Sequence, residues 1–163
     1  MYNNSTTIIM TLKTFLFFNS IYPFFSKEDN DEVWRPVTKV ELEQVLQNMP
    51  KDKSHGPDRW TQEFFSTFFD LVRDDLLRVI EESRLQGRVE GAINSTIITL
   101  IPKESAPESL FDYRPISLCN FVYKLISKII ANRIRGRLGE FISSKQFGFL
   151  KDRLITDAIG MVQ

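Results

Sequence analysis

The stretch TLIPKESAPESLFDYRPISL, residues 99–118, combines apolar runs, prolines and a polar loop. The β-branched run just before Pro102 is typical of a strand, and the missing N–H of that proline limits further strand pairing. In the sequence YRPISL, Pro115 keeps Arg114 out of the helical region of backbone space. The stretch therefore predicts a hairpin-like pair of short strands, near residues 96–101 and 113–118.

Helical patterns surround this pair of strands. The capping-box sequence TKVE, which begins at Thr38, predicts a helix over about 38–49. Apolar and aromatic residues at four-residue steps predict one long amphipathic helix over about 60–87. Asn120 can cap a third helix that runs to about residue 139. The predicted fold class is α+β, mainly helical, with a short two-stranded element.

Residues 1–35 read as an apolar extension followed by an acidic linker. The run IIMTLKTFLFFNSIYPFF, residues 8–25, is interrupted by Lys13 and Asn19, so it does not predict a membrane span. The polar sequence SKEDNDEVWRP follows and is rich in Asp and Glu, as linkers often are. Membrane or partner contact through the apolar run stays open as an alternative.

The charge of the chain is balanced overall but not along its length. The 21 basic and 21 acidic residues cancel, so net charge does not indicate a polyanionic partner. Between Arg114 and Lys151 there are eight Lys or Arg and one acid, Glu140. Such a segment is either a solvated helix face or a footprint for phosphates. With Cys119 as the only cysteine and one histidine, the chain has no internal disulfide or Cys/His zinc cluster, which favours the cytoplasm or nucleus.

Lys103 and Arg114 flank the loop at positions that the prolines constrain. Fixed cations suit a site that holds a triphosphate, and Arg can bind phosphate oxygens through two parallel N–H groups. A structural alternative is also open: Lys103 would be an exposed strand-end charge, and Arg114 would pair with Asp112 or Glu108.

Residues 94–138, NSTIITLIPKESAPESLFDYRPISLCNFVYKLISKIIANRIRGRL, resemble the fingers region of reverse transcriptases from LINE-type non-LTR retroelements, particularly those of plants. In that family a Leu-Ile-Pro-Lys strand and a Tyr-Arg-Pro-Ile-Ser-Leu segment precede a Lys-Leu-Ser-Lys-x-x-Ala-x-Arg helix. The upstream KSHGPDRW is similar to the family's Lys-x-x-Gly-Pro-Asp-Gly, and QFGFLKDRLITDAI, residues 146–159, is similar to a later motif. The resemblance implies a partial reverse transcriptase domain over residues 36–163. This domain would comprise the fingers and the start of the palm, so its palm would be truncated.

The resemblance also implies roles for particular residues. It places Lys103 and Arg114 at the triphosphate of the incoming nucleotide. It places three cations of the following helix near template or nucleotide phosphates: Lys124, Lys128 and Arg133. The motif loop consists of Gly56, Pro57 and Asp58, and its role is either substrate contact or turning the chain and capping the long helix. The family has glycine at the positions of Arg59 and Asp152. Glycine adopts a positive φ without strain and other residues do not, so the family's backbone conformation is an open question at both positions.

The carboxylates of a polymerase are missing. The family holds two Mg²⁺ ions with aspartates of two palm motifs, one of them aromatic-Ala-Asp-Asp, which does not occur here. Adjacent Asp74 and Asp75 lie in a predicted helix and point apart, and Asp152 falls in the motif before the palm. We therefore predict no catalytic residue and no bound cofactor in this chain, with Mg²⁺ expected only for the full-length family enzyme.

The sequence thus predicts a fragment of an RNA-directed DNA polymerase that is inactive alone. Its partners by resemblance are an RNA/DNA template-primer, deoxynucleoside triphosphates and a missing palm segment. Two alternatives remain: a nucleic-acid-binding module without chemistry, and a helical membrane-associated or partner-binding protein.

Overall fold

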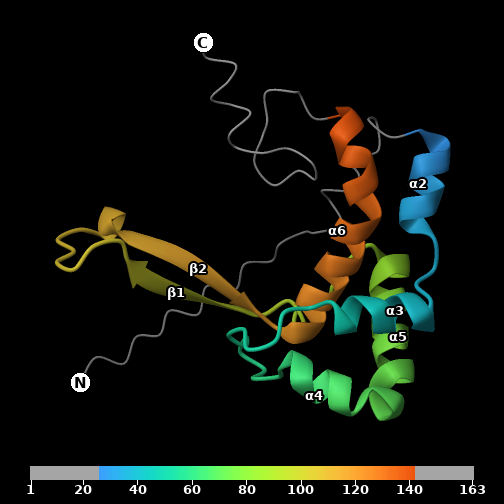
Figure 1. Cartoon of the computed structure of the whole chain (residues 1–163), viewed down its shortest axis with the longest axis horizontal. Helices are drawn as coiled ribbons and strands as arrows, with labels where there is room; N and C mark the ends of the chain where they lie inside the picture. The colour runs from blue at the N-terminus through green and yellow to red at the C-terminus, as the bar shows by residue number, and fades with distance from the viewer. Residues whose placement is uncertain (1–25, 142–163) are drawn as a thin grey trace.

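A computed structural model describes residues 26–141 of the chain. The apolar extension, the motif of residues 146–159 and Asp152 lie outside the described residues. Five helices and one antiparallel strand pair form an α+β fold in this range. Figure 1 shows a helical body from which the strand pair projects as an arm. Among the described helices, none combines the length and apolar character that crossing a bilayer requires.

The arm confirms the predicted strand pair. Strand β1, Thr96–Pro102, pairs antiparallel with β2, Tyr113–Cys119, and a short 3-10 turn η1, Leu110–Asp112, lies between them. Most of the arm's side chains are exposed on both faces, which a two-stranded ribbon cannot stabilise by itself. Its base is anchored instead, because Thr96 is buried and Asn120 Nδ2 donates to the Ala92 carbonyl at 2.9 Å.

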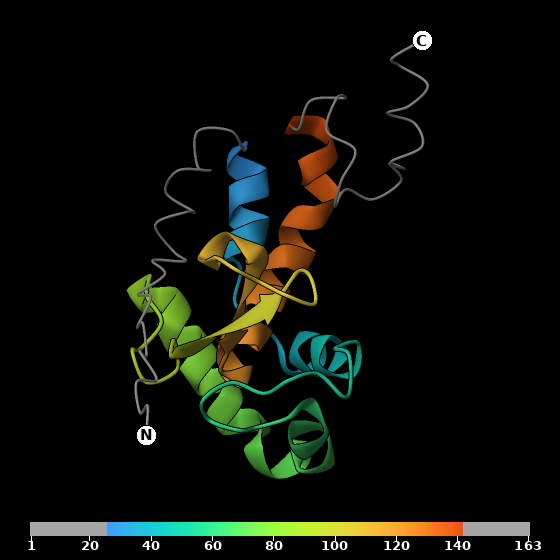
Figure 2. The ribbon, with the colours of Figure 1, turned by 90° about the vertical axis from the view of Figure 1, so that its left-hand side faces the viewer.

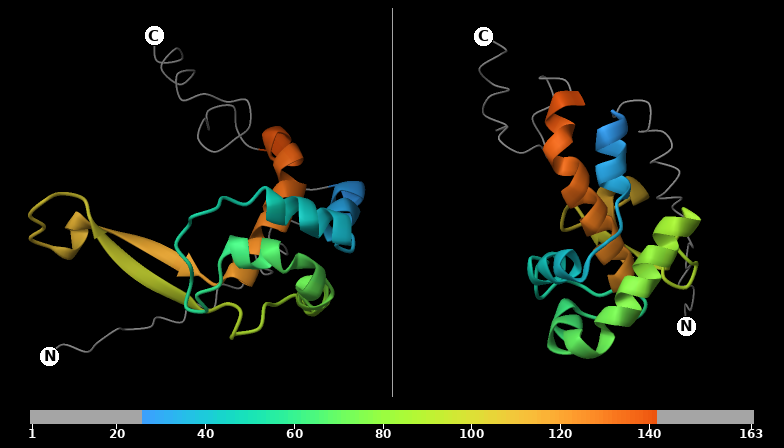
Figure 3. Two further views of the ribbon diagram at one scale, coloured as in Figure 1. Left: turned by 60° about the horizontal axis from the view of Figure 1, so that its bottom comes forward. Right: turned by 90° about the vertical axis from the view of Figure 1, so that its right-hand side faces the viewer.

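The predicted linker is wrong, because the acidic stretch forms a helix. Helix α2, Lys27–Trp34, begins at Ser26, whose hydroxyl accepts the Asp29 N–H at 3.1 Å. It lies beside α6, Phe121–Phe141, in Figures 2 and 3. Val33 is buried there, and Arg137 pairs with Asp29 at 3.0 Å. The acidic side chains that suggested a solvated linker are thus partly neutralised by Arg137 of a distant helix.

The predicted long helix is divided into α4, Gln62–Thr67, and α5, Phe69–Gln86, at Phe68. Each four-residue step turns about 40° beyond a full helical turn, so five steps from Trp60 to Ile80 would rotate the apolar stripe by about 200°. A single straight helix could not bury such a stripe on one side. With the break, Phe65 stacks on Phe121 from α4, while Leu76 and Ile80 enter the core from α5, and Trp60 and Phe68 stay half-exposed.

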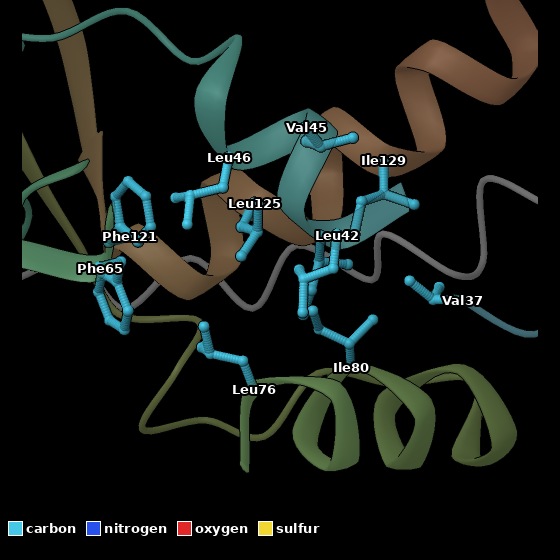
Figure 4. Packing of buried hydrophobic residues seen from close by; sticks show 11 residues of the cluster. Val37, Leu42, Val45, Leu46, Phe65, Leu76, Ile80, Phe121, Leu125 and Ile129 are labelled. Atoms are coloured by element: carbon cyan, nitrogen blue, oxygen red, sulfur yellow. The ribbon is translucent and has the colours of Figure 1, made fainter. Parts of the chain in front are cut away.

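The core lies where α3, Lys39–Gln47, and α5 meet α6, as Figure 4 shows. Leu42 and Leu46 of α3 face Leu125 and Ile129 of α6, and all four side chains are almost completely buried. The helical spacings at 38–49 and beyond Asn120 correctly predicted the apolar faces that these four side chains belong to. The arm leads directly into α6, so the core fixes the base of the arm relative to the helical body.

Candidate nucleic-acid interface

Lys103 and Arg114 lie on the same face of the arm. Arg114 is directly opposite Ile101, and the Lys103 N–H donates to the Asp112 carbonyl at 2.7 Å, which extends the strand pairing by one step. Side chains two residues apart on a strand share a face, so the two cations are diagonal neighbours. Both side chains are exposed.

Neither cation forms an ion pair with the residues that the structure describes. The proposed salt-bridge partner Asp112 is engaged within the loop, where its carboxylate accepts N–H groups of Ser109 and Glu108. These bonds, chiefly those from Ser109, hold the pKa of Asp112 below its usual value. The Lys103 ammonium donates to the Phe111 carbonyl, so it is held against the loop and keeps two N–H donors.

The motif loop locks onto the junction between the arm and α6. The Asp58 carboxylate accepts the Phe121 N–H at 3.1 Å and the Trp60 N–H at 3.2 Å, while the Asp58 N–H donates to Asn120 Oδ1 at 3.0 Å. Asp58 therefore satisfies an orphan N–H at the start of α6, whereas Thr61 caps α4. The predicted cap residue Asn120 does precede α6, but its side chain holds the loop and the Ala92 carbonyl instead.

Gly56 and Arg59 show how closely this loop is fitted. A Cβ on Gly56 would lie 2.3 Å from the Cys119 carbonyl oxygen, so only glycine allows this approach. Arg59 has a φ of 59°, the left-handed conformation that the family's glycine at this position led us to question. The side chain at Arg59 therefore does not prevent the turn. Pro57 lies between these contacts, and no substrate contact is needed to explain the loop.

Lys124 and Lys128 are one turn apart on α6 and are both partly exposed. The Lys124 ammonium donates to the Ser54 carbonyl at 2.8 Å, which ties the segment just before the motif loop to α6. Neither lysine forms an ion pair within the described residues.

Arg133 occupies a different environment from the two lysines. Its side chain is only 5% exposed. The guanidinium has five N–H donors, and five acceptors lie within hydrogen-bond distance of it. Two of these are the Glu41 carboxylate oxygens, at 2.8 and 2.7 Å, and the others are the carbonyls of Val33, Arg35 and Pro36. This geometry leaves Arg133 no free donor for a phosphate, and it joins α2, α3 and α6.

Glu41 is the acid at the centre of this junction, and sequence reasoning missed it. Burial alone would raise its pKa, but hydrogen bonds and charge from Arg133, together with Arg35, outweigh burial and lower the pKa. The capping-box pattern predicted that the Glu41 side chain would cap the N-terminus of its own helix. Only half of that box is seen, because Thr38 accepts the Glu41 N–H at 3.2 Å while the carboxylate turns to Arg133.

The described residues contain no group of three His, Cys, Asp or Glu side chains that could hold a metal ion. Asp74 pairs with Lys39 at 2.6 Å, and Asp75 pairs with Arg78 at 2.8 Å. The two carboxylates thus point to different partners. These two carboxylates therefore do not converge on a shared ion.

Comparison with known proteins adds one relationship. No protein-family model matches the sequence. The chain is 31% identical over 141 residues to the Transposon TX1 uncharacterized 149 kDa protein of Xenopus laevis. The match covers 86% of this chain and 11% of that protein. The chain is therefore similar to a short segment of a much longer transposon protein.

Proposed function

We propose that this chain corresponds to the fingers part of a reverse transcriptase from a LINE-type non-LTR retrotransposon. Its function would be to hold phosphates of an incoming deoxynucleotide and of a template-primer. The observation that carries the proposal is the distribution of ion pairs. Six arginines of the described chain pair with acids, namely Arg35, Arg73, Arg78, Arg84, Arg133 and Arg137, whereas Lys103, Arg114, Lys124 and Lys128 form no such pair in the described part of the chain. Similarity to a transposon protein supports the same reading.

The arm is the nucleotide-binding part of this proposal. Lys103 and Arg114 share one face, and strand pairing holds their backbone, so little backbone freedom is lost when a triphosphate binds. Arg114 can contact two phosphate oxygens at once, and Lys103 adds a point charge beside it. Together they would neutralise part of the triphosphate charge.

The start of α6 is the template-primer part. Lys124 and Lys128 present two charges one helical turn apart, on the side of α6 that leaves the core. Contacts from these lysines to a sugar-phosphate backbone would be independent of sequence and weakened by salt. Asp58 and Gly56 would act as positioning residues, since they fix the angle between the arm and α6.

The chemical step would need converging carboxylates, and the described residues contain no group of three His, Cys, Asp or Glu side chains that could hold a metal ion. In the full-length family enzyme, bound Mg²⁺ would neutralise the transferring phosphates. The role proposed for the described residues is to bind and orient phosphates. A nucleic-acid-binding module without chemistry would share the α6 lysines, but it would not require nucleotide binding by the arm.

Nucleotide binding by the arm separates these two functions. Lys103→Gln and Arg114→Gln should each weaken binding of a fluorescent dATP analogue by about tenfold, because a hydrogen bond to a charged group contributes roughly 1.5–3 kcal/mol. Arg78→Gln removes an equal charge from a paired site on α5 and should leave nucleotide binding unchanged. Equal affinities of all three variants would contradict the nucleotide role and favour the module without chemistry.

A further inference from the structure

The row of basic residues on the exposed side of α6 extends beyond Lys124 and Lys128. At about 100° per residue, the positions 124, 128, 131 and 135 fall within about 60° of arc. This row lies about 140° from the mean direction of the core residues Leu125, Ile126 and Ile129. Its members are Lys124, Lys128, Ala131 and Arg135, and we call them the α6 stripe. Ala131 and Arg135 are exposed, and the two lysines are partly exposed.

Arg135 differs from the neighbouring arginines of the same helix. Arg133 uses all five donors inside the protein, and Arg137 pairs with Asp29 at 3.0 Å and Glu32 at 3.6 Å. Arg135 forms no ion pair with the side chains described in residues 26–137. Within these described residues, no ion pair would have to be broken for the Arg135 guanidinium to bind an external anion.

The spacing of the stripe fits an extended polyanion better than a single phosphate group. Lys124 and Arg135 are eleven residues apart, which corresponds to about 16 Å along the helix axis. One mononucleotide cannot contact both ends of such a row. A sugar-phosphate backbone that follows the helix can contact all three cations, and the small Ala131 between them leaves room for it.

We propose that Arg135 is a third backbone-phosphate contact of this protein, and that the bound strand runs along α6 from Lys124 to Arg135. The inference rests on the proposed function, because it assumes that Lys124 and Lys128 bind nucleic acid. It replaces Arg133 with Arg135 as the arginine of this surface. The predicted partner is an RNA–DNA hybrid or another nucleic-acid backbone, without preference for sequence.

The test compares Arg135→Gln with Arg137→Gln in the full chain, using an RNA–DNA hybrid and fluorescence anisotropy over a series of salt concentrations. Both variants lose one charge, but only Arg135→Gln should weaken binding, by roughly three- to tenfold at low salt, and reduce the slope of log affinity against log salt by about 0.9. Arg135→Lys should restore most of the slope. Thermal unfolding of each variant checks that the fold is unchanged.

The outcomes separate this inference from the proposed function. If Lys124→Gln and Lys128→Gln weaken binding but Arg135→Gln behaves like Arg137→Gln, the proposed function survives and the extended stripe is wrong. If the wild-type chain does not bind the hybrid at low salt, both are wrong. Equal losses from Arg135→Gln and Arg137→Gln would show general attraction of a polyanion and would also overturn the assignment of Arg135.

Discussion

Two arginines two residues apart on α6 lie in opposite environments. Arg133 is buried with Glu41 and three backbone carbonyls, while Arg135 is exposed on the α6 stripe. Composition cannot distinguish them, since both belong to the same basic segment. Their difference follows from the helical angle of about 200° between them, which directs one toward α2 and α3 and the other toward solvent.

Arg133→Met should therefore lower the free energy of unfolding strongly, by about 2–4 kcal/mol, because it leaves three carbonyls without their donor and removes one of the two arginine partners of the partly buried Glu41 carboxylate. Arg35 still pairs with Glu41 at 3.0 Å and limits the loss. Arg135→Met is the matched control and should change stability by less than about 0.5 kcal/mol. Urea unfolding measures both variants, and similar losses would contradict a structural role for Arg133.

At the scale of elements, two acids make stability depend on pH: Glu41 joins α3 to α6 through Arg133, and Glu81 joins α5 to Val37, which precedes α3. Burial opposes ionisation of Glu41 and Glu81, but Arg133 lowers the pKa of the first, and Arg84 and the Val37 N–H lower that of the second. A pKa lowered by folding contributes stability above the unfolded value, and this contribution is lost as pH falls through the folded value. The relevant pH window lies below the ordinary glutamate pKa of 4.5.

We accordingly expect the free energy of unfolding to fall as pH decreases from about 5 toward 3. Glu41→Gln should be less stable than wild type at pH 7 and should lose less stability over this acid range. Urea unfolding at several pH values checks both expectations. If the free energy of unfolding falls as steeply with decreasing pH in Glu41→Gln as in wild type, other groups control the acid sensitivity.

The elements differ in how far sequence could predict them. The strand pair, α3 and α6 follow local rules, because prolines, a capping box and apolar spacing act within a few residues. The break at Phe68 and helix α2 depend on contacts made across the fold. Asp58 shows the same limit within the site, since its partners Asn120 and Phe121 are more than sixty residues away. Local patterns therefore predicted the position of the loop correctly. They predicted that it would cap the long helix, whereas Asp58 caps α6.

On the scale of the whole molecule, the fold joins a helical body with paired charges to an arm and a helix face with unpaired ones. The body is stabilised by the α3, α5 and α6 core and by the Arg133 junction. The arm is attached to it through the motif loop and the start of α6, so the two groups of cations keep a fixed relation. Such an arrangement suits a surface that positions phosphates, as proposed for the fingers of a polymerase.

The most direct test of this account is the salt dependence of RNA–DNA hybrid binding when Lys124 and Lys128 are both changed to Gln. The prediction is weaker binding and a slope of log affinity against log salt that is lower by about 1.8, with unchanged thermal unfolding. The control double variant, Lys39→Gln with Arg78→Gln, loses the same charge from sites paired with Asp74 and Asp75 and should keep the wild-type slope. Identical slopes for the two double variants would contradict a phosphate-binding surface on α6.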